Sequence, residues 1–336
     1  MKIKAFIISA VSLIVVGLTV AVVTLAVNQF NIGELTEELV PNTYNVEGEF
    51  NSIKCDLDTA DIDILYISEG KSFVSTLEND KISFTVEVVD GVLKITEKRE
   101  IENWYDLVNW SSVCVDLYIN KNTFINVTIK NDTGDINILD AFKIDNLVID
   151  SDTSNITLSS LEVQTIDSNI STGDFYIENS RITSLKSKTS TGESKVRNCK
   201  VFENVTIEAS TGKICLENFE IGGKLSTKVS TGNIEISDTT CDSYESSSST
   251  GRVKLTNLVV TNDLNIKTST GDVKLNSIDA TNIYIETSTG DVTGTIKSDK
   301  IFFLDSNTGK EDSPFSTTGG ICKVISDTGD ITLDYE

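Results

Sequence analysis

A Thr-Gly pair returns every 19 or 20 residues between residues 133 and 329, with Ser154 once in place of the glycine. So regular a period is typical of a repeat protein, in which each repeat is one structural unit that is stabilised by stacking on its neighbours. This period restricts the fold more than any other feature of the sequence. The glycines are Gly134, Gly173, Gly192, Gly212, Gly232, Gly251, Gly271, Gly290, Gly309 and Gly329.

Apolar residues occupy fixed positions within each repeat. Two and four residues after the glycine they alternate with polar ones, as in Ile234 and Ile236, which is the pattern of a short strand with one buried face. A second strand precedes the next glycine, where the position of Leu225 is never charged in any repeat. A weaker pair, such as Phe219 and Ile221, indicates a third strand. Three short strands without helical spacing predict one coil of a parallel β-solenoid per repeat, about eleven coils in a single all-β stack.

The glycine is expected to form a corner of each coil. Inward positions are odd-numbered before the glycine and even-numbered after it, so the chain must break its pleat there, and glycine adopts the positive φ that such a corner needs. The same count places the preceding Thr inward or along the corner, where its hydroxyl would bond between coils instead of forming an outward array. We therefore predict structural corners at Gly173, Gly192, Gly212, Gly232, Gly251, Gly271 and Gly290.

Residues 5–27 form an uncharged stretch of 23 residues that follows Lys2 and Lys4. A stretch of this length spans a bilayer as one transmembrane helix, and the lysines before it predict that residues 1–4 are cytoplasmic. We expect an uncleaved signal anchor that leaves a single-pass protein in the cell membrane with its C-terminal domain extracellular. Cleavage near Ala26 is the alternative.

The rest of the chain is expected to be one β-solenoid domain, residues 44–336, behind a polar and acidic tether of residues 28–43. Regular repeats occupy residues 131–336, whereas residues 44–130 are less regular. Within that N-terminal part, the Asp90-Gly91 pair between two strand-like segments predicts a hairpin.

The two ends of a solenoid need atypical segments that hide the open edge of the outermost coil. Trp104, Tyr105 and Trp110 form the only aromatic cluster of the sequence. We interpret this cluster as part of an N-terminal cap, and a partner or ligand contact is the alternative. At the other end, we expect acidic residues to oppose end-to-end stacking by charge: Asp327, Asp330, Asp334 and Glu336.

Six cysteines in an exported chain suggest a disulfide framework. However, Cys199, Cys241 and Cys322 fall on inward positions of well-separated coils, which are beyond disulfide reach. These three are predicted to be small core residues. Cys55 and Cys114 lie in the irregular part, and a disulfide between them stays open.

Beyond the membrane segment, the chain carries 26 Lys and Arg against 51 Asp and Glu, a net charge of −25. Such a surface repels nucleic acid and anionic lipid headgroups, which excludes a nucleic-acid partner. Cationic partners, or anionic polymers bridged by divalent ions, remain compatible with it.

The sequence contains no His, which removes Ser-His and Cys-His nucleophilic sites and His-containing metal sites. The position directly after the glycine is mostly acidic or amide, but Lys213, Arg252 and Lys310 interrupt it. We therefore expect solvated corner residues and no continuous Ca²⁺ ladder, and an isolated weak site at Asp272 and Asp291 is the alternative. No catalytic, cofactor-binding or metal site is predicted.

The segment from Phe50 to Ile64, the strand-like runs at residues 92–95 and 114–119, and the repeated Ser-Thr-Gly-Asp units resemble a bacterial putative-adhesin family of unknown function. Its domains are also called toastrack β-solenoids. The resemblance covers about residues 44–336. It implies an envelope protein, often tied to the membrane and linked to envelope-stress systems, and it supplies no catalytic residues.

We therefore expect a non-enzymatic, membrane-anchored extracytoplasmic module for cell-surface binding, adhesion or envelope-stress sensing. Its partners would be the membrane, through residues 5–27, and a cell-envelope polymer or envelope-stress membrane proteins. Two alternatives stay open. One is a carboxylate-based polysaccharide lyase or glycosidase of the β-helix type, and the other is ice binding, which requires an outward plane of regularly spaced Thr.

Overall fold

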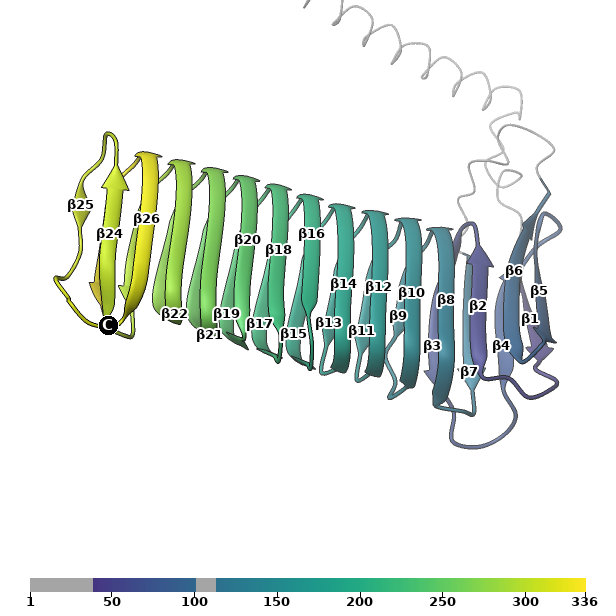
Figure 1. Ribbon diagram of the computed structural model, residues 1–336. Helices are drawn as coiled ribbons and strands as arrows, with labels where there is room; N and C mark the ends of the chain where they lie inside the picture. Colours follow the sequence, from purple (N-terminus) through teal and green to yellow (C-terminus); the bar gives the residue numbers. More distant parts are fainter. Residues whose placement is uncertain (1–38, 101–112) are drawn as a thin grey trace, which may run out of the picture.

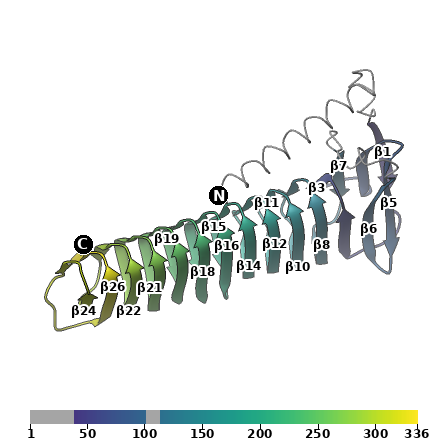
Figure 2. The ribbon, with the colours of Figure 1, turned by 90° about the horizontal axis from the view of Figure 1, so that it is seen from above.

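The computed structural model describes residues 39–100 and 113–336, and every regular element in them is a β-strand. The strands follow one another along a single long axis and build a rod, with the first described strands at one end and the C-terminus near the other (Figures 1 and 2). Within these two segments, no helix has the length and apolar character needed to cross a bilayer. The predicted membrane segment, residues 5–27, lies outside the described residues.

Two rows of strands run along the rod and meet at the glycine corners. The strands before the corner form the first row with parallel pairing: β2 (Ser52–Leu57), β8 (Thr123–Thr133), β10 (Lys143–Thr153), β12 (Glu162–Thr172), β14 (Arg181–Thr191), β16 (Val205–Thr211), β18 (Lys224–Thr231), β20 (Ser243–Thr250), the second parts of β21 (Val253–Thr270) and β22 (Val273–Thr289), then β26 (Gly320–Thr328) and β24 (Lys300–Ser306).

The strands after the corner form the second row: β3 (Ala60–Tyr66), β9 (Ile136–Ile138), β11 (Ile156–Ser159), β13 (Phe175–Glu178), β15 (Ser194–Val201), β17 (Ile214–Ile221), β19 (Ile234–Cys241), the first parts of β21 and β22, β23 (Val292–Ile296), β27 (Ile331–Tyr335) and β25 (Glu311–Asp312). The predicted parallel β-solenoid is confirmed.

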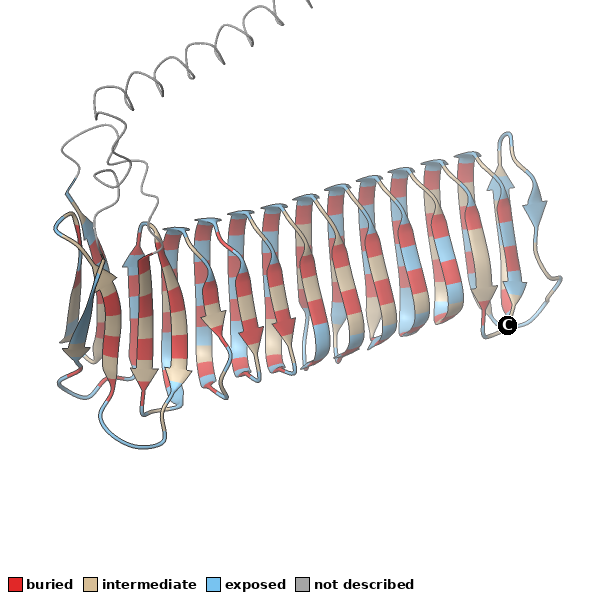
Figure 3. Cartoon of the chain, turned by 180° about the vertical axis from the view of Figure 1, so that it is seen from behind, coloured by how far each residue is buried: buried red, intermediate tan, exposed pale blue. Residues whose placement is uncertain are grey.

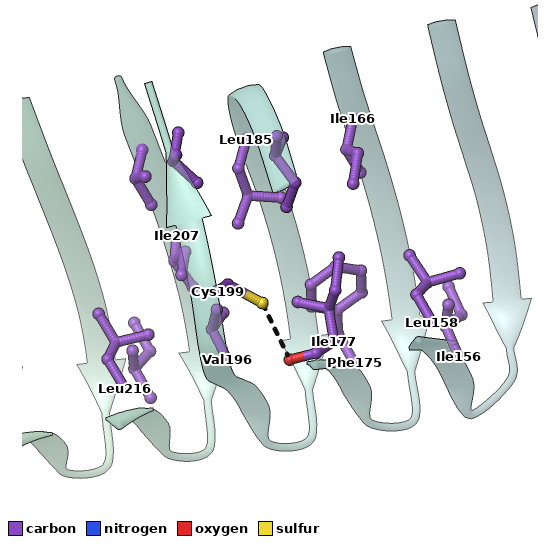
Figure 4. Packing of buried hydrophobic residues seen from close by; sticks show 14 of the residues in the cluster. Ile156, Leu158, Ile166, Phe175, Ile177, Leu185, Val196, Cys199, Ile207 and Leu216 are labelled. Carbon is purple, nitrogen blue, oxygen red and sulfur yellow. Dashed lines mark hydrogen bonds between the residues drawn. The ribbon is translucent and has the colours of Figure 1, made fainter. Parts of the chain in front are cut away.

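The core is a set of apolar columns that run along the rod. Leu225 is paired with Val205 on one side and Tyr244 on the other, and all three are buried. Buried residues alternate with more exposed ones along most strands, in step with their neighbours (Figure 3). Figure 4 shows the columns after the corner, where Phe175, Ile177 and their counterparts fill the interior. The weak third strand of the sequence is also inward, because Phe219 and Ile221 are buried.

The glycine corners have the geometry that the sequence predicts. The seven predicted corner glycines have φ between 129° and 150°. A Cβ on Gly232 would lie 1.6 Å from the carbonyl oxygen of Gly212, so the coils approach too closely there for any side chain.

A second corner, six residues after the glycine, was missed in the sequence. Asn198 and Asn218 have φ near 51°, in the left-handed region that Asn tolerates best among residues with a side chain. The Asn218 side-chain amide donates to Asn198 Oδ1 at 2.8 Å. The same conformation recurs at Ser160, Asn179, Asp238, Asn257 and Ser277.

The stacking order departs from the chain order at both ends of the rod. β22 pairs with β26 rather than with β24, and β26 pairs in turn with β24. The last segment of the chain is therefore inserted under the preceding one, so these coils are not stacked in chain order. At the other end, β2 lies between β8 and the later strand β6 (Val92–Arg99), and β3 lies between β9 and the later strand β7 (Val113–Ile119).

Antiparallel strands cover the N-terminal end. The outermost strand β5 (Ile82–Val89) pairs with β6 across the Asp90-Gly91 turn, which confirms the predicted hairpin. In the other row, β1 (Val40–Asn45) pairs with β4 (Phe73–Glu78), and β4 pairs with β7. The predicted cap residues Trp104, Tyr105 and Trp110 lie outside the described residues.

All six cysteines lie in the described segments, and all are free. Cys199, Cys241 and Cys322 are buried, as predicted for core residues. Cys55 is buried in β2, whereas Cys114 is only half-buried in β7. The pairing that the sequence left open between these two does not form, because Cys55 lies in the core and the alternation of β7 directs Cys114 outward.

Candidate functional site

The Thr that precedes each glycine is exposed in every repeat, and so is the residue before it. The expected inward or corner-directed Thr is therefore wrong. The Thr is exposed because the alternation of buried and exposed residues ends before the glycine. The residue three places before the glycine, such as Thr189 or Ala209, is buried, and the next two residues are both exposed. Near the corner, backbone packs directly on backbone, which leaves no interior room for the Thr side chain.

These exposed residues are in register from coil to coil. Thr191 is paired with Thr172 and Thr211, and Thr231 with Thr211 and Thr250. Adjacent strands of a sheet lie about 4.8 Å apart, so one hydroxyl pair recurs at that spacing. We call this surface the hydroxyl ridge, and it consists of Ser171, Thr172, Ser190, Thr191, Ser210, Thr211, Ser230, Thr231, Ser249, Thr250, Ser269, Thr270, Ser288 and Thr289.

The hydroxyl ridge has no charge of its own. At the Ser position of the two coils before it stand Asp132 and Asp152, and Asp327 stands there in the coil after it. Ser171 Oγ donates to Asp152 Oδ1 at 3.4 Å at the boundary. A neutral, hydroxyl-bearing strip thus crosses the middle of a chain whose net charge is −23.

The column directly after the glycine has a structural role that the sequence did not reveal. Asn155 N–H is bonded to Asp135 Oδ1 at 3.0 Å, and Asp174 N–H is bonded to Asn155 Oδ1 at 3.1 Å. Each Asp or Asn side chain in this series caps the backbone of the next coil. The expected exposed position is confirmed for most of the column, but the carboxylates are also engaged in the corner rather than free in solvent.

The suggested calcium pair belongs to this capping series. Asp272 Oδ1 accepts the N–H of Asp291 at 3.4 Å, and Arg252 lies 3.7 Å from Asp272. Across residues 39–100 and 113–336, no three His, Cys, Asp or Glu side chains gather in a way that would hold a metal ion.

Charged side chains outside the corner pair between coils. Lys186 Nζ lies 2.9 Å from Asp167, and Lys200 Nζ lies 2.6 Å from Glu220. Because both pairs are exposed, each contributes little to stability. The pairs place opposite charges side by side on β12 and β14 and on β15 and β17.

The repeat geometry and the family comparison agree. The family model for Toastrack DUF4097 matches residues 50–257 and 224–335, which together cover most of the chain. The chain belongs to this toastrack family. A search of curated proteins found no match.

Several solved structures are similar to this toastrack chain at low identity. A putative adhesin from Parabacteroides distasonis is 16% identical, with a TM-score of 0.45, over 89% of this chain and 97% of the other. A putative adhesin from Parabacteroides merdae is 15% identical, with a TM-score of 0.40, over 89% and 96%. A protein from P. distasonis described as a putative lipid binding protein is 12% identical, with a TM-score of 0.37, over 87% and 96%. Similarities at this level do not bear on function.

The toastrack rod also carries a surface hollow of about 550 Å³ where the chain crosses to its terminal coil. Lys300 lines it with only 2% of its surface exposed, and burial lowers the pKa of its ammonium group. The Lys300 ammonium donates to Ser298 Oγ and to the carbonyl oxygen of Asp299, and Ser298 Oγ donates to Asp279 Oδ1 at 2.5 Å. These bonds hold the crossing segment against β22, so we assign Lys300 a structural role that no sequence pattern indicated.

Proposed function

We propose that this toastrack protein is a non-enzymatic binding module at the bacterial cell surface, and that its hydroxyl ridge binds a neutral, hydroxyl-rich polymer of the envelope. In this proposal, residues 5–27 anchor the chain in the cell membrane, residues 1–4 are cytoplasmic and residues 44–336 are outside. Adhesion or envelope sensing would follow from occupancy of the ridge.

The observation that carries the proposal is the in-register exposure of Ser and Thr. A hydroxyl both donates and accepts hydrogen bonds, which matches the groups of a saccharide. Each contact in water is weak, with a net contribution of about 1 kcal/mol. A repeating ligand that engages several coils at once adds these contacts within a single binding event, as multivalent ligands do.

The lack of charge on the ridge supports a neutral ligand. An anionic polymer would be repelled by the acidic body of the rod. The corner carboxylates are the groups that a lyase or glycosidase would need, and the structure uses them to cap backbone amides. This use favours recognition over cleavage.

The test is binding of the purified full chain, in detergent, to isolated envelope fractions and purified polysaccharides, with and without Ca²⁺. We expect saturable binding without release of cleaved sugars. The diagnostic variant carries Thr191→Val, Thr211→Val and Thr231→Val, which remove three neighbouring hydroxyls from exposed sites and nearly preserve shape. It should bind at least about tenfold more weakly, a loss of about 1.4 kcal/mol.

The matched control is Thr240→Val, because Thr240 is exposed in the same part of the rod but away from the ridge. It should bind like the wild type. Equal binding by the triple variant and the wild type would reject the ridge as the site. Release of sugar products would reject the non-enzymatic role.

Ice binding is a second candidate, because the Thr column is outward and evenly spaced. Ice binding requires an outward plane of Thr, and the structure has one outward column of Thr instead of a full plane. Thermal hysteresis of the purified chain tests it directly, and its absence at millimolar protein would remove this candidate.

A further inference from the structure

The C-terminal end of the rod is formed by the segment of residues 297–319. Its strand β24 pairs with β26 and, among the described strands, with no other. The second edge of β24 therefore has no strand partner, and an unpaired edge is a template for pairing with another chain. The last backbone amide of β24, Ser306 N–H, is already bonded to Glu311 Oε1 at 2.6 Å.

Apolar side chains gather at this end. Phe303 is 54% exposed and Phe315 is 92% exposed. Phe302 and Leu304 occupy inward positions but are only partly buried, whereas their counterparts one coil further in, Cys322 and Val324, are fully buried. The end face thus presents core residues that one more layer would cover.

This end is also nearly neutral. Residues 297–319 hold three lysines and four acidic residues, a net charge of −1. The acidic residues that we expected at the end lie one coil further in: Asp327 on β26, Asp330 at the corner that follows, Asp334 on β27 and Glu336 directly after β27. That expectation is wrong, because the final strands are inserted under residues 297–319. Charge repulsion between two copies is therefore small where their C-terminal ends meet.

We propose that the C-terminal end docks on the same end of a second copy of this chain, with the two β24 strands paired antiparallel about a two-fold axis. A two-fold contact uses one surface twice and closes on itself. The alternative, C-terminal end on N-terminal end, would have to displace the antiparallel strands β1, β4 and β5 that already cover the N-terminal end.

The sequence of β24 suits this pairing. With the axis at Phe303, antiparallel register places Phe302 opposite Leu304 of the second copy and Ile301 opposite Asp305 of the second copy. In this register, inward residues of one copy pair with inward residues of the other, so the apolar interior continues across the contact. No acidic residue of β24 faces another, and like charges directly opposite would destabilise the pair. The two N-terminal ends then point away from each other, which is the geometry of a bridge between two surfaces.

The experiment measures the mass of the full chain in detergent by sedimentation, with the detergent contribution matched out, at protein concentrations from about 1 to 100 μM. This range brackets the dissociation constants of weak to moderate specific interfaces. We expect wild-type dimers, and rods joined end to end in negative-stain images. Phe303→Asp should weaken the dimer at least tenfold, because it sets two carboxylates at the axis.

A matched control exists in the middle of the rod. Phe202 is 53% exposed, so Phe202→Asp makes the same chemical change at the same exposure, far from the end. It should dimerise like the wild type, and both variants should keep the wild-type circular dichroism spectrum. Three outcomes would overturn the proposal: a wild type that is monomeric at 100 μM, as expected if the end takes a strand of another protein; a Phe303→Asp variant that dimerises unchanged; or rods joined elsewhere. This test does not depend on the hydroxyl ridge, so its failure and the failure of the proposed function are separate results.

Discussion

At the N-terminal end of the rod, antiparallel strands lie over the outermost coil, whereas at the C-terminal end the parallel stack stops at β24. The N-terminal cover has its own buried residues, including Val74, Ile82 and Phe84. At the C-terminal end, Phe302 and Leu304 remain partly exposed. The order of two coils is exchanged at both ends, but only the N-terminal end is covered. The exchange alone therefore does not cover the open edge of a coil.

The two ends also differ in how a glutamate satisfies the outer backbone. Glu97 is buried at the N-terminal end and accepts the N–H groups of Asp58 and Thr59, both at 2.8 Å. Glu311 is exposed at the C-terminal end and accepts one N–H group. The N-terminal end is therefore covered by strands of the same chain, whereas the C-terminal end has the character of an interface.

The largest effect should come from a charge in the middle of the rod. Leu225 is fully buried, so Leu225→Asp places an unpaired carboxylate in the core and should cost more than about 4 kcal/mol. Because coils are stabilised by their neighbours, the rod should break into halves, and the covered N-terminal half should outlast the C-terminal half in limited proteolysis.

The control for this change is Asp272→Asn, which keeps the Oδ1 atom that caps Asp291. It should shift stability by less than about 0.5 kcal/mol. If the two substitutions prove equally harmless, the assignment of inward columns is wrong. If the C-terminal half outlasts the other, the contrast between the ends is wrong.

A direct comparison of the ends comes second. Phe84 is 5% exposed in the N-terminal cover, so Phe84→Ala should cost about 3 to 5 kcal/mol. Phe302 already meets solvent, and Phe302→Ala should cost clearly less, about 1 to 2 kcal/mol. Urea denaturation at low protein concentration, where a dimer is dissociated, gives both values. Equal costs would show that the C-terminal end is as well covered as the N-terminal end.

Much of the fold was predictable because the repeat fixes local structure. The glycine corners, the apolar columns and the Asp90-Gly91 hairpin follow from period, parity and turn chemistry, and all three are confirmed. The coil exchange was not predicted, although the coil after Gly309 departs from the repeat, with Glu311 and Ser313 where most coils have apolar residues. The period alone does not show which coils pair.

The candidate site was harder to predict for a related reason. The prediction for Thr191 and its counterparts assumed that inward and outward positions alternate up to the glycine. In the structure, the last two residues before the glycine are both exposed. The capping role of Asp135 and Asn155 depends on a neighbour twenty residues away. Such a contact can be inferred only once the coils are known to be in register.

Buried thiols give a third, smaller test of both ends. Burial raises the pKa of Cys55, Cys241 and Cys322 to about 12, and these residues lie near the N-terminal end, in the middle and near the C-terminal end. As pH rises, these thiols ionise in the unfolded chain at a lower pH than in the folded chain. Their contribution to the free energy of unfolding is therefore fully present below a pH of about 9 and is lost as pH rises from there towards 12. At pH 10 the loss should be about 1.4 kcal/mol for each thiol.

The measurement is the free energy of unfolding at pH 8 and pH 10, with a reductant present. Cys55→Ala and Cys322→Ala should each remove about 1.4 kcal/mol of the pH dependence. If Cys322→Ala leaves the dependence unchanged while Cys55→Ala reduces it, water reaches the core below the terminal coil. That result would sharpen the contrast between the ends.

The smallest effect concerns the second corner, whose left-handed series runs from Ser160 to Ser277 and so stops before both ends. Asn218→Ala should cost about 1 kcal/mol, because alanine tolerates a φ of 51° less well and loses the bond to Asn198. Asn218→Gly removes the same bond but accepts this φ, so it should recover part of the loss. Urea midpoints of the two variants check the order. If glycine is worse than alanine, the left-handed φ at residue 218 does not limit the stability of the alanine variant, and the second corner does not select for residues that tolerate this φ.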